Sequence, residues 1–225
     1  MYANAFKRVI DLFLSFVALL VLSPIILILT IVGAIKMKGN PFFTQQRPGK
    51  DERIFKLIKF RTMTNAKDKN GKLLPDDERL TKYGRFLRAT SLDELPELIN
   101  IFVGDMAVVG PRPQLVRDMV FMSEEERTRH SVRPGLTGLA QINGRNTVTW
   151  EKKFVYDLEY IQNITLWNDI KIIFKTVMKV TKCDGISAAG MATAEDFGDY
   201  LLREGKVDQE TYDKRQKEAK ELMEA

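Results

Sequence analysis

The segment LFLSFVALLVLSPIILILTIVGAI, residues 12–35, contains no charged residue. A helix needs about 20 apolar residues to cross the hydrocarbon core of a bilayer, so this segment is long enough to do so. Ser23-Pro24 lies at its centre, and proline removes a backbone hydrogen bond and bends a helix where it occurs. The segment therefore predicts an N-terminal membrane helix with a break at Ser23-Pro24.

The flanks of this segment indicate how it sits in a membrane. A cleaved signal peptide is disfavoured, because the apolar run is too long and Lys36 and Lys38 follow it in place of a small-residue cleavage site. Lys7 and Arg8 precede it, so both ends are basic. Positive charge marks the cytoplasmic side, and both ends lie there if the helix enters the membrane, turns at its central proline and returns. This re-entrant arrangement and a kinked transmembrane span both remain open from the residues alone.

Composition limits the chemistry that the chain can use. The 225 residues suffice for one domain with attached segments, and the formal net charge of +5 favours anionic partners such as lipid headgroups, nucleic acid or phosphorylated substrates. The single cysteine, Cys183, excludes an internal disulfide framework and a multi-cysteine metal site. The single histidine, His130, disfavours a histidine relay. Carboxylates, arginines and lysines must therefore carry any catalysis.

The rest of the chain predicts an α+β fold that is predominantly helical. Apolar periodicity predicts helices over residues 80–88, 91–103, 115–130, 150–163 and 169–182. A strand is expected over residues 54–63, a loop over 65–77, an extended turn over 108–113 and turn-rich chain over 132–145. We divide the chain into the membrane helix (1–38), a small cytosolic domain (39–194) and a polar tail (195–225) of one or two loosely held helices.

The predicted helix over residues 169–182 is basic and amphipathic. One face carries Lys171, Lys175, Lys179 and Lys182, and the opposite side carries Ile170, Ile173, Phe174, Val177 and Val180. A basic amphipathic helix can lie on an anionic membrane surface. The apolar face of an ordinary surface helix packs on the core instead. The pattern favours neither interpretation over the other.

Two adjacent acids, Asp93 and Glu94, lie in the stretch SLDELPELINIFVGDMAVVGPRP, residues 91–113. The common interpretation is structural, because Ser91 followed three residues later by Glu94 fits a capping box at a helix start. The alternative is that the acids do chemistry. The local pattern favours capping, so other parts of the chain must decide.

Arginines beside glycine or proline recur in the predicted turns. They occur in Arg47-Pro48-Gly49, Pro111-Arg112-Pro113, Arg133-Pro134-Gly135 and Gly144-Arg145-Asn146. A rigid turn can hold a guanidinium where it grips a phosphate, and two nearby carboxylates suit Mg²⁺. A diphosphate site is therefore plausible, and the absence of GxxxxGK[ST] and GxGxxG motifs disfavours a P-loop or dinucleotide-binding enzyme.

Residues 1–194 resemble the monotopic phosphoglycosyl transferases, the bacterial sugar transferases that begin membrane glycoconjugate assembly. The resemblance is carried by the apolar segment with Ser23-Pro24 and by five motifs. These are FTQQRPG (43–49), KFRTM (59–63), LRATSLDELPELINIFVGDMAVVGPRP (87–113), RHSVRPGLTGLAQINGRN (129–146) and WEKKFVYDLEYI (150–161). The tail beyond residue 194 lies outside it.

The resemblance implies a reaction and a set of site residues. Members of the family transfer a sugar 1-phosphate from a nucleotide diphosphate sugar, usually a UDP-sugar, to a membrane polyprenyl phosphate such as undecaprenyl phosphate. By resemblance, Asp93 is the nucleophile and a Mg²⁺ ligand, and Glu94 acts on the acceptor or holds the metal. Arg112 would bind phosphate. The family positions around the active site that bind substrate fall on Lys59, Arg88, Arg112, Arg145 and Asp157.

The resemblance also implies a location and partners. The domain at 39–194 is expected to be catalytic, with interfacial amphipathic helices, and the protein to be monotopic on the cytoplasmic face of the bacterial inner membrane. A UDP-sugar, polyprenyl phosphate and membrane lipid are the expected partners, a homodimer is possible, and nucleic acid is not expected. Two alternatives use the same residues differently: a hydrolase of nucleotide sugars or polyprenyl diphosphates, and a non-enzymatic scaffold at the membrane surface.

Overall fold

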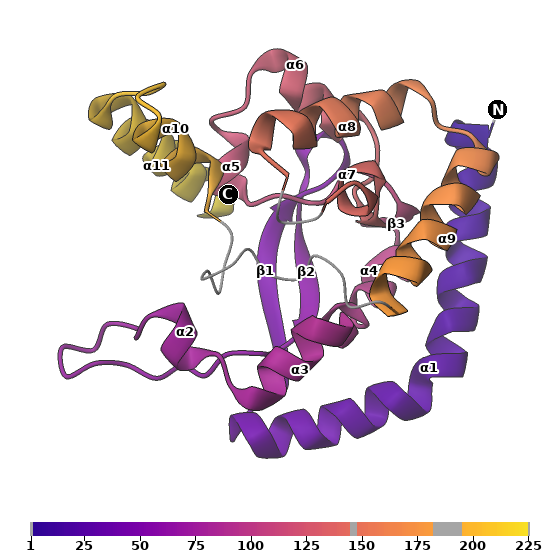
Figure 1. The fold of residues 1–225 in the computed structure, drawn as a ribbon, viewed down its shortest axis with the longest axis horizontal. Helices are drawn as coiled ribbons and strands as arrows, with labels where there is room; N and C mark the ends of the chain where they lie inside the picture. Colours follow the sequence, from indigo (N-terminus) through magenta and orange to yellow (C-terminus); the bar gives the residue numbers. More distant parts are fainter. Residues whose placement is uncertain (1, 145–147, 182–194, 225) are drawn as a thin grey trace.

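The computed structural model describes residues 2–144, 148–181 and 195–224 (Figure 1). Within these ranges the chain is mostly helical, as the sequence predicts, with two small sheets. Strands β1 (Phe42–Pro48) and β2 (Ile54–Phe60) form an antiparallel hairpin at the centre of the molecule, and β3 (Ala107–Val109) pairs in parallel with β4 (Gly135–Thr137).

Helices surround these sheets. They are α1 (Lys7–Met37), α2 (Asp76–Arg79), α3 (Lys82–Thr90), α4 (Glu97–Val103), α5 (Val116–Met119), α6 (Glu124–Arg127), α7 (Leu139–Ile142), α8 (Trp150–Gln162), α9 (Leu166–Thr181), α10 (Phe197–Arg203) and α11 (Gln209–Glu224). A π-helical turn, η1 (Tyr2–Phe6), precedes α1, and 3₁₀ turns occur at η2 (Lys50–Glu52), η3 (Leu92–Glu94) and η4 (Thr128–Ser131).

Helix α1 is continuous but sharply bent near its middle, where Pro24 lies (Figure 1). Proline has no N–H to donate to the carbonyl of Leu20, four residues earlier. The hydroxyl of Ser23 donates to that carbonyl instead, at 2.8 Å. The break predicted at Ser23-Pro24 is thus a bend whose freed carbonyl is satisfied by the neighbouring serine. We call residues 7–22 the first arm and residues 24–37 the second arm.

Both arms of α1 pack against the rest of the protein. In the first arm, Leu19 and Leu22 contact a buried cluster formed by Leu57, Leu98, Ile101 and Met106. In the second arm, Leu29 is buried with Phe60 and Leu87. The hydroxyl of Tyr83 on α3 donates to the Leu29 carbonyl at 3.1 Å. The bend therefore lets one helix line two sides of the domain.

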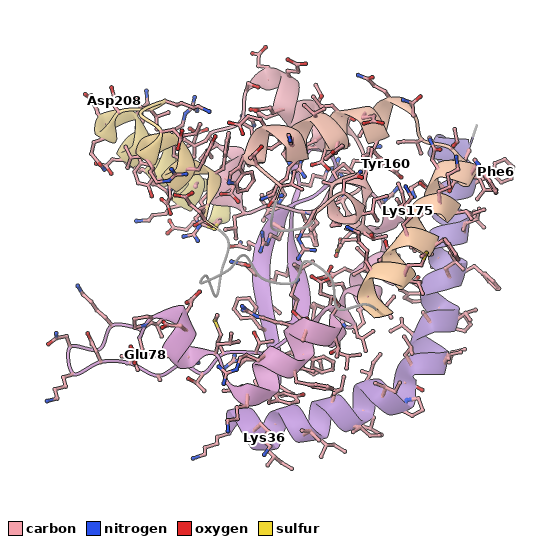
Figure 2. All side chains as sticks on the ribbon, in the orientation of Figure 1. Phe6, Lys36, Glu78, Tyr160, Lys175 and Asp208 are labelled. Atoms are coloured by element: carbon pink, nitrogen blue, oxygen red, sulfur yellow. The ribbon has the colours of Figure 1, made fainter. Side chains whose placement is uncertain are left out.

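The outward side of α1 is apolar and exposed. Side chains such as Phe13 (63% exposed), Val21 (69%) and Ile35 (69%) face away from the protein. The helix is long and apolar enough to cross a membrane by length and composition. Figure 2 places Phe6 and Lys36 near its opposite ends. The topology of this helix in a bilayer remains a prediction.

Helix α9 lies beside the first arm (Figure 1). The sequence left open whether its apolar side faces the core. Ile172 is buried, but Ile170, Phe174 and Val177 are exposed. These three side chains therefore do not pack on the core, which favours the interpretation that α9 lies at a membrane surface.

The polar tail is more firmly packed than predicted. Phe197 of α10 is 4% exposed and joins Met122, Trp150 and Phe154 in one cluster. Ala219 of α11 is 1% exposed and packs against α5. The tail forms two helices, as predicted, and each of them buries an apolar residue against the rest of the protein. The domain boundaries at residues 38 and 194 stay a prediction.

Several predicted elements match and others do not. The turn-rich chain predicted over residues 132–145 contains β4 and α7, and the extended turn predicted over 108–113 begins within β3. The strand over residues 54–63 is β2, and the helices over 80–88, 150–163 and 169–182 are α3, α8 and α9 with shifted ends. Residues 91–103 form a 3₁₀ turn and then α4. Residues 115–130 form the short helices α5 and α6 and a 3₁₀ turn, because Ser123 and Glu126 make a capping box that starts a new helix.

Candidate active site

Asp93 and Glu94 lie on the 3₁₀ turn η3, between α3 and α4. Ser91 ends α3 with a φ of 56°, in the left-handed region, and its side chain makes no capping hydrogen bond. The carboxylate of Glu94 accepts hydrogen bonds from two cationic side chains instead. The capping box predicted for Ser91 and Glu94 is therefore wrong.

Glu94 is the centre of a cluster of charges. Its Oε1 accepts from Lys59 Nζ at 2.8 Å and from Arg112 Nη2 at 2.7 Å. Lys59 Nζ also lies 3.0 Å from Oε1 of Glu97, the first residue of α4. Strand β2, η3, α4 and the loop after β3 thus each supply a side chain. We call Lys59, Asp93, Glu94, Glu97 and Arg112 the dyad cluster.

Asp93 differs from the other members of the dyad cluster. Among the residues that the structure describes, none donates a hydrogen bond to its carboxylate. Burial and the neighbouring Glu94 raise the pKa of Asp93 to about 6, against the opposing effect of Lys59, Arg88 and Arg112. The carboxylate is therefore largely ionised at neutral pH, more basic than an ordinary aspartate, and available to attack an electrophile or bind a cation.

The pKa values of Glu94 and Glu97 are shifted in opposite directions, although both carboxylates contact Lys59. Burial by itself raises the pKa of Glu94, but Arg112 and Lys59 outweigh it and hold that pKa well below its usual range. Burial raises the pKa of Glu97 to about 7, with Lys59 opposing the rise and Glu94 adding to it. Neighbouring titratable groups whose pKa values are driven apart are typical of catalytic sites.

A close approach of α3 to the end of β2 places Arg88 beside the cluster. A Cβ on Gly84 would lie 1.9 Å from the carbonyl oxygen of Thr62, so the packing requires glycine. One turn further along α3, Arg88 Nε donates to Thr62 Oγ1 at 3.1 Å. The predicted site residues Lys59, Arg88 and Arg112 are thereby brought together around the two acids.

The Pro111-Arg112-Pro113 turn that carries Arg112 is held at three successive carbonyls. The carbonyl of Pro111 accepts from the backbone N–H of Gly135 at 2.9 Å. The carbonyl of Arg112 accepts from Arg129 Nη2 at 2.7 Å, and that of Pro113 accepts from Arg47 Nη1 at 3.2 Å. These bonds fix the backbone from which the Arg112 guanidinium reaches Glu94.

Asp157 lies behind this turn and does not face the dyad. Its carboxylate is 2% exposed and accepts from Arg129 Nε and Nη2, at 2.9 and 2.6 Å. Arg129 in turn bonds the Arg112 carbonyl. The predicted substrate-binding residue Asp157 is therefore separated from Glu94 by Arg129 and Arg112, three contacts in all, and its carboxylate binds Arg129 in the interior of the protein.

The other predicted arginine turns take different places. Arg47 is buried, and burial and the nearby Arg112 lower its pKa to about 10. Arg133 Nε donates to the carbonyl of Gly104 at the end of α4, at 2.7 Å, which is a structural contact. Arg145 lies outside the described residues.

The site fits Mg²⁺ through Asp93. Among the described residues, no group of three or more His, Cys, Asp or Glu side chains could hold a metal by itself. Mg²⁺ usually takes one or two carboxylates and completes its shell with water and substrate phosphates. Asp93 has no hydrogen-bond donor among the described residues, whereas Oε1 of Glu94 already accepts from Lys59 and Arg112. Asp93 is therefore the better ligand of the two acids.

Sequence interpretation missed Glu97 and Arg129. Glu97 follows Glu94 by three residues, a spacing that brings side chains together on a helical turn, so the signal was present. Arg129 gave no local signal, because its partner Asp157 is 28 residues away.

Comparison with known proteins identifies the family that this arrangement belongs to. Residues 2–183 match the family model described as bacterial sugar transferase. A protein of Bacillus subtilis (strain 168) named as an uncharacterized sugar transferase, EpsL, is 47% identical over 191 residues, covering 85% of this chain and 95% of the relative. Both the match and the likeness include the dyad and the Pro111-Arg112-Pro113 turn.

Two further relatives have names that state a reaction. A Klebsiella pneumoniae protein named UDP-glucose:undecaprenyl-phosphate glucose-1-phosphate transferase is 44% identical over 188 residues, 77% of this chain and 40% of the relative. A Salmonella typhimurium (strain LT2) protein named undecaprenyl-phosphate galactose phosphotransferase is 36% identical over 197 residues, 80% of this chain and 41% of the relative. The chain thus spans about two fifths of the length of these two proteins.

Proposed function

Because the chain belongs to the bacterial sugar transferase family, we propose that it transfers a sugar 1-phosphate from a UDP-sugar to undecaprenyl phosphate or a similar polyprenyl phosphate. The products are a polyprenyl diphosphate sugar and UMP. The names of the Klebsiella and Salmonella relatives support this reaction class, and they differ in the sugar, glucose in one and galactose in the other. The proposal therefore specifies the reaction and leaves the sugar open.

The observation that carries the proposal is the state of Asp93. Its carboxylate is largely ionised, accepts no hydrogen bond from the described residues and stands among Lys59, Arg88 and Arg112. A nucleophile needs a free lone pair, and a diphosphate needs cations around it. Asp93 supplies the first requirement, and the surrounding side chains supply the second.

In the first step, an oxygen of Asp93 attacks the phosphorus that bears the sugar. The bond from this phosphorus to the bridging oxygen breaks, and UMP leaves with the electron pair of that bond. Asp93 is left carrying a phosphosugar. Arg112 and Lys59 neutralise charge on the phosphoryl oxygens as UMP leaves, since fixed cations stabilise such transition states most effectively in a site that excludes water.

In the second step, a phosphate oxygen of the polyprenyl phosphate attacks the same phosphorus, and the bond to Asp93 breaks. The polyprenyl diphosphate sugar forms and the Asp93 carboxylate is restored. Glu94 already holds Lys59 and Arg112 at 2.8 and 2.7 Å, so its role is to fix these two cations between the donor and the acceptor.

We also propose that Mg²⁺ binds at Asp93 together with the diphosphate of the donor. Bound there, the ion would neutralise charge on the diphosphate oxygens. Arg88, held by Thr62, would complete the positive side of the site.

We further propose that the protein is monotopic on the cytoplasmic face of the membrane. Both arms of α1 are attached to one domain: Arg8 Nη1 donates to the Ile101 carbonyl at 2.6 Å, and Tyr83 donates to the Leu29 carbonyl at 3.1 Å. A straight span would carry the second arm, and Leu29 with it, away from that domain. A re-entrant helix keeps both contacts. The homodimer stays a prediction.

The reaction is tested by measuring UMP release from a panel of UDP-sugars, with and without polyprenyl phosphate. The proposal predicts multiple turnovers only when the acceptor is present. Multiple turnovers without the acceptor would favour the hydrolase, with water as acceptor. No Mg²⁺-dependent turnover with any sugar would favour the scaffold.

The covalent step is tested separately by intact-mass analysis after incubation with a UDP-sugar and Mg²⁺, without acceptor. The wild type is expected to gain the mass of a phosphosugar, mapped by peptide analysis to Asp93. An active enzyme that forms no adduct under any trapping condition, and whose kinetics require both substrates to be bound together, would replace the covalent step with direct transfer.

The membrane arrangement is tested with cysteines placed singly at residues 4 and 40, in a chain whose natural Cys183 is replaced by serine. In sealed vesicles, a membrane-impermeant thiol reagent should label both positions from the same side. Labelling from opposite sides would establish a span. Replacing both Ser23 and Pro24 with leucine should move the segment toward a span, because the bend is removed.

A further inference from the structure

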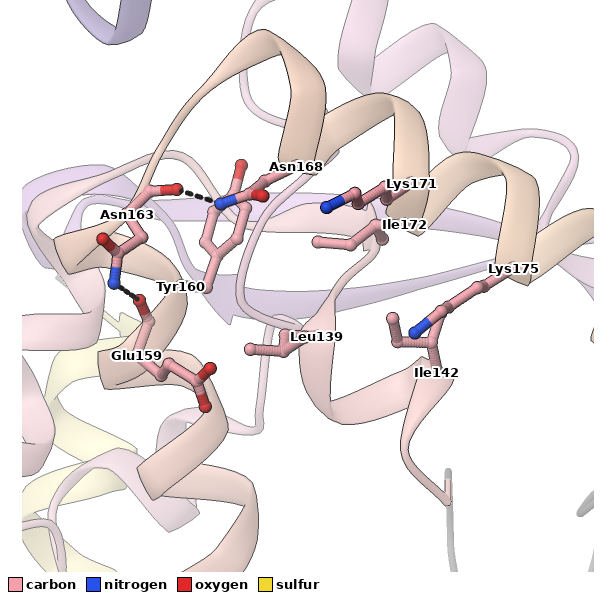
Figure 3. A pocket seen from close by; sticks show the side chains of 9 residues that line it. All are labelled: Leu139, Ile142, Glu159, Tyr160, Asn163, Asn168, Lys171, Ile172 and Lys175. Carbon is pink, nitrogen blue, oxygen red and sulfur yellow. Dashed lines mark hydrogen bonds between the residues drawn. The ribbon is translucent and has the colours of Figure 1, made fainter.

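Helices α7, α8 and α9 enclose a cavity of about 140 Å³ that is separate from the dyad cluster (Figure 3). Its polar lining includes Lys171 and Lys175 of α9, and Asn168 and Glu159, while its apolar floor includes Ile142. A water molecule occupies about 30 Å³ of liquid, so the cavity has room for a group the size of a phosphate diester. None of the residues assigned to the transferase reaction lines it.

The two lysines are cations without an ion-pair partner among the described residues. No carboxylate in the described ranges lies within 4.0 Å of either ammonium group, and Lys171 Nζ instead lies 5.6 Å over the Trp167 ring. Glu159 lines another side of the cavity, away from the two lysines (Figure 3). Two lysines against one carboxylate leave the cavity positive, which suits an anion.

The position of these lysines around α9 indicates where that anion comes from. At about 100° per residue, the exposed apolar side chains of α9 occupy one continuous arc. They are Leu166, Trp167, Ile170, Phe174, Val177 and Met178. Lys171 and Lys175 come next around the helix, and the buried Ile172 follows them.

Going around α9, a sector of exposed apolar side chains is therefore followed by a basic sector and then by a buried one. A helix at a membrane surface shows this order when its apolar arc enters the acyl region and its lysines lie at the level of the lipid phosphates. The mouth of the cavity is then at the same level, because the lysines that border the apolar arc also line the cavity.

We propose that this cavity binds the phosphate of an anionic phospholipid headgroup, with Lys171 and Lys175 as its cationic partners. The proposal rests on the monotopic arrangement in the proposed function and on the placement of α9 at the membrane surface. The Glu159 carboxylate would accept hydrogen bonds from the rest of the headgroup, and the Asn168 amide would both accept and donate them. These partners favour a headgroup that carries hydroxyl groups. A bound lipid would fix the depth of α9 and, through the Lys7–Asp169 ion pair at 2.7 Å, the first arm of α1.

The test compares two double variants of the full chain in detergent. Lys171→Gln with Lys175→Gln removes the cations of the cavity. Lys36→Gln with Lys179→Gln removes the same charge from α1 and α9 but from residues that do not line the cavity. Native mass spectrometry would measure binding of phosphatidylglycerol and of phosphatidylcholine with the same acyl chains, and UMP release would be recorded on the same samples.

The wild type is expected to bind phosphatidylglycerol at least about tenfold more tightly than phosphatidylcholine. The cavity variant should lose about tenfold or more in affinity for phosphatidylglycerol, since both charged contacts are removed, and the control variant should stay within about twofold. Equal losses in the two variants, or no loss in either, would overturn the proposal.

A competition experiment separates a lipid site from a site for free phosphate. Inorganic phosphate or glycerophosphoglycerol at the concentration of the lipid should displace little phosphatidylglycerol, because neither has acyl chains to place beside Trp167 and Phe174. Displacement as effective as that by the lipid would assign the cavity to a soluble phosphate and overturn the lipid proposal. A protein that prefers phosphatidylglycerol but releases no UMP would contradict the proposed function and leave the lipid site standing.

Discussion

Two groups of charged side chains lie wholly or partly out of solvent in this protein, and they are satisfied in different ways. One is the dyad cluster. The other joins the first arm of α1 to α8 and α9, and we call it the anchor cluster; its members are Tyr2, Lys7, Asp11, Tyr160 and Asp169. Both contain carboxylates next to a lysine, so composition alone does not distinguish them.

In the anchor cluster every carboxylate oxygen of Asp169 has a donor. Oδ2 accepts from Lys7 Nζ and from the Tyr2 hydroxyl, both at 2.7 Å, and Oδ1 accepts from the Tyr160 hydroxyl at 2.9 Å. Asp11 accepts from the backbone N–H of Val108 at 3.0 Å. A buried polar network in which each of these oxygens has a donor holds helices in one arrangement and leaves little acceptor capacity for a ligand.

In the dyad cluster the hydrogen bonds from Lys59 and Arg112 both go to Glu94, and no described residue donates one to Asp93. Burial and the neighbouring Glu94 raise the pKa of Asp93 to about 6, whereas at Glu94 burial is outweighed by Arg112 and Lys59, which hold that pKa well below its usual range. The comparison shows that burial of charge does not by itself mark a functional site. The distinguishing feature is the carboxylate that the protein buries without giving it a donor.

The largest effect is expected from Asp93→Asn, which tests this distinction directly. Turnover should fall by at least about 10³-fold, because an amide is a poor nucleophile. Stability should not fall. The folded pKa of Asp93 is raised from 3.8 to about 6, so its ionised form weakens the folded state as the pH rises through that value. At pH 7.5 the midpoint of thermal unfolding should equal or exceed that of the wild type.

A matched control for Asp93→Asn is Asp77→Asn, at an exposed aspartate on α2. It should change neither turnover nor the unfolding midpoint. An Asp93→Asn protein that keeps most of its activity but unfolds several degrees lower would assign Asp93 to the structural class represented by Asp169.

Asp169→Asn should give the opposite result. Breaking a buried ion pair leaves Lys7 with only Asp11, at 3.8 Å, and removes about 3 kcal/mol of stability, or roughly 6–12 °C in the unfolding midpoint. Turnover per folded molecule should stay within about threefold. Lys7→Met added to Asp169→Asn should lower the midpoint by less than the sum of the two single changes, since the unpaired cation is also removed.

The sequence predicted the elements whose signal is local. Periodicity located α3, α8 and α9 and the strand β2, and Ser23-Pro24 located the bend in α1. It also placed Asp93 and Glu94 next to each other and supplied the family. The predicted elements share one property, that their information lies within one turn or one strand of the chain, whereas the family rests on motifs spread along residues 1–194.

The sequence could not predict which partner each side chain takes. The pattern of Ser91 and Glu94 predicted a local cap, but Lys59 and Arg112, 35 and 18 residues from Glu94, took its carboxylate. Lys59 and Arg112 each bring a full positive charge to the Glu94 carboxylate, whereas the backbone N–H of a cap brings only a partial one, so the distant cations prevail over the local cap. Asp157 was assigned to substrate by the family resemblance, and nothing local in the sequence reveals its pairing with Arg129.

Arg112→Lys tests the role of the cations in the dyad cluster. Lysine keeps the charge but lacks the planar fork, and it cannot contact Glu94 and a phosphate in the same geometry. Turnover should fall by about 30- to 100-fold, equivalent to about 2–2.7 kcal/mol, as measured by UMP release. The control is Arg133→Lys, whose guanidinium bonds the Gly104 carbonyl and should leave turnover nearly unchanged. Similar turnover in the two variants would show that Arg112 does not bind phosphate.

The smallest effect concerns Glu97, which is buried like Asp169 and whose one ion-pair partner in the described part of the chain is Lys59. Burial raises its pKa from 4.5 to about 7, so its contribution to stability is complete at low pH and is lost as the pH rises through about 7. Glu97→Gln removes that titration. Between pH 6 and pH 8 the wild type should lose about 1.4 kcal/mol relative to the variant, or roughly 3–6 °C in the difference between their unfolding midpoints.

The direction of this pH dependence separates the roles that Glu97 can have. If its main role were to hold Lys59 as an ion pair, the variant would become the less stable protein as the pH rises and Glu97 ionises. If instead its burial dominates, the variant becomes the more stable one, and turnover at pH 8 should stay within about threefold because Glu94 still holds Lys59 at 2.8 Å. Thermal unfolding of both proteins at pH 6, 7 and 8, with turnover measured at each pH, decides between these outcomes.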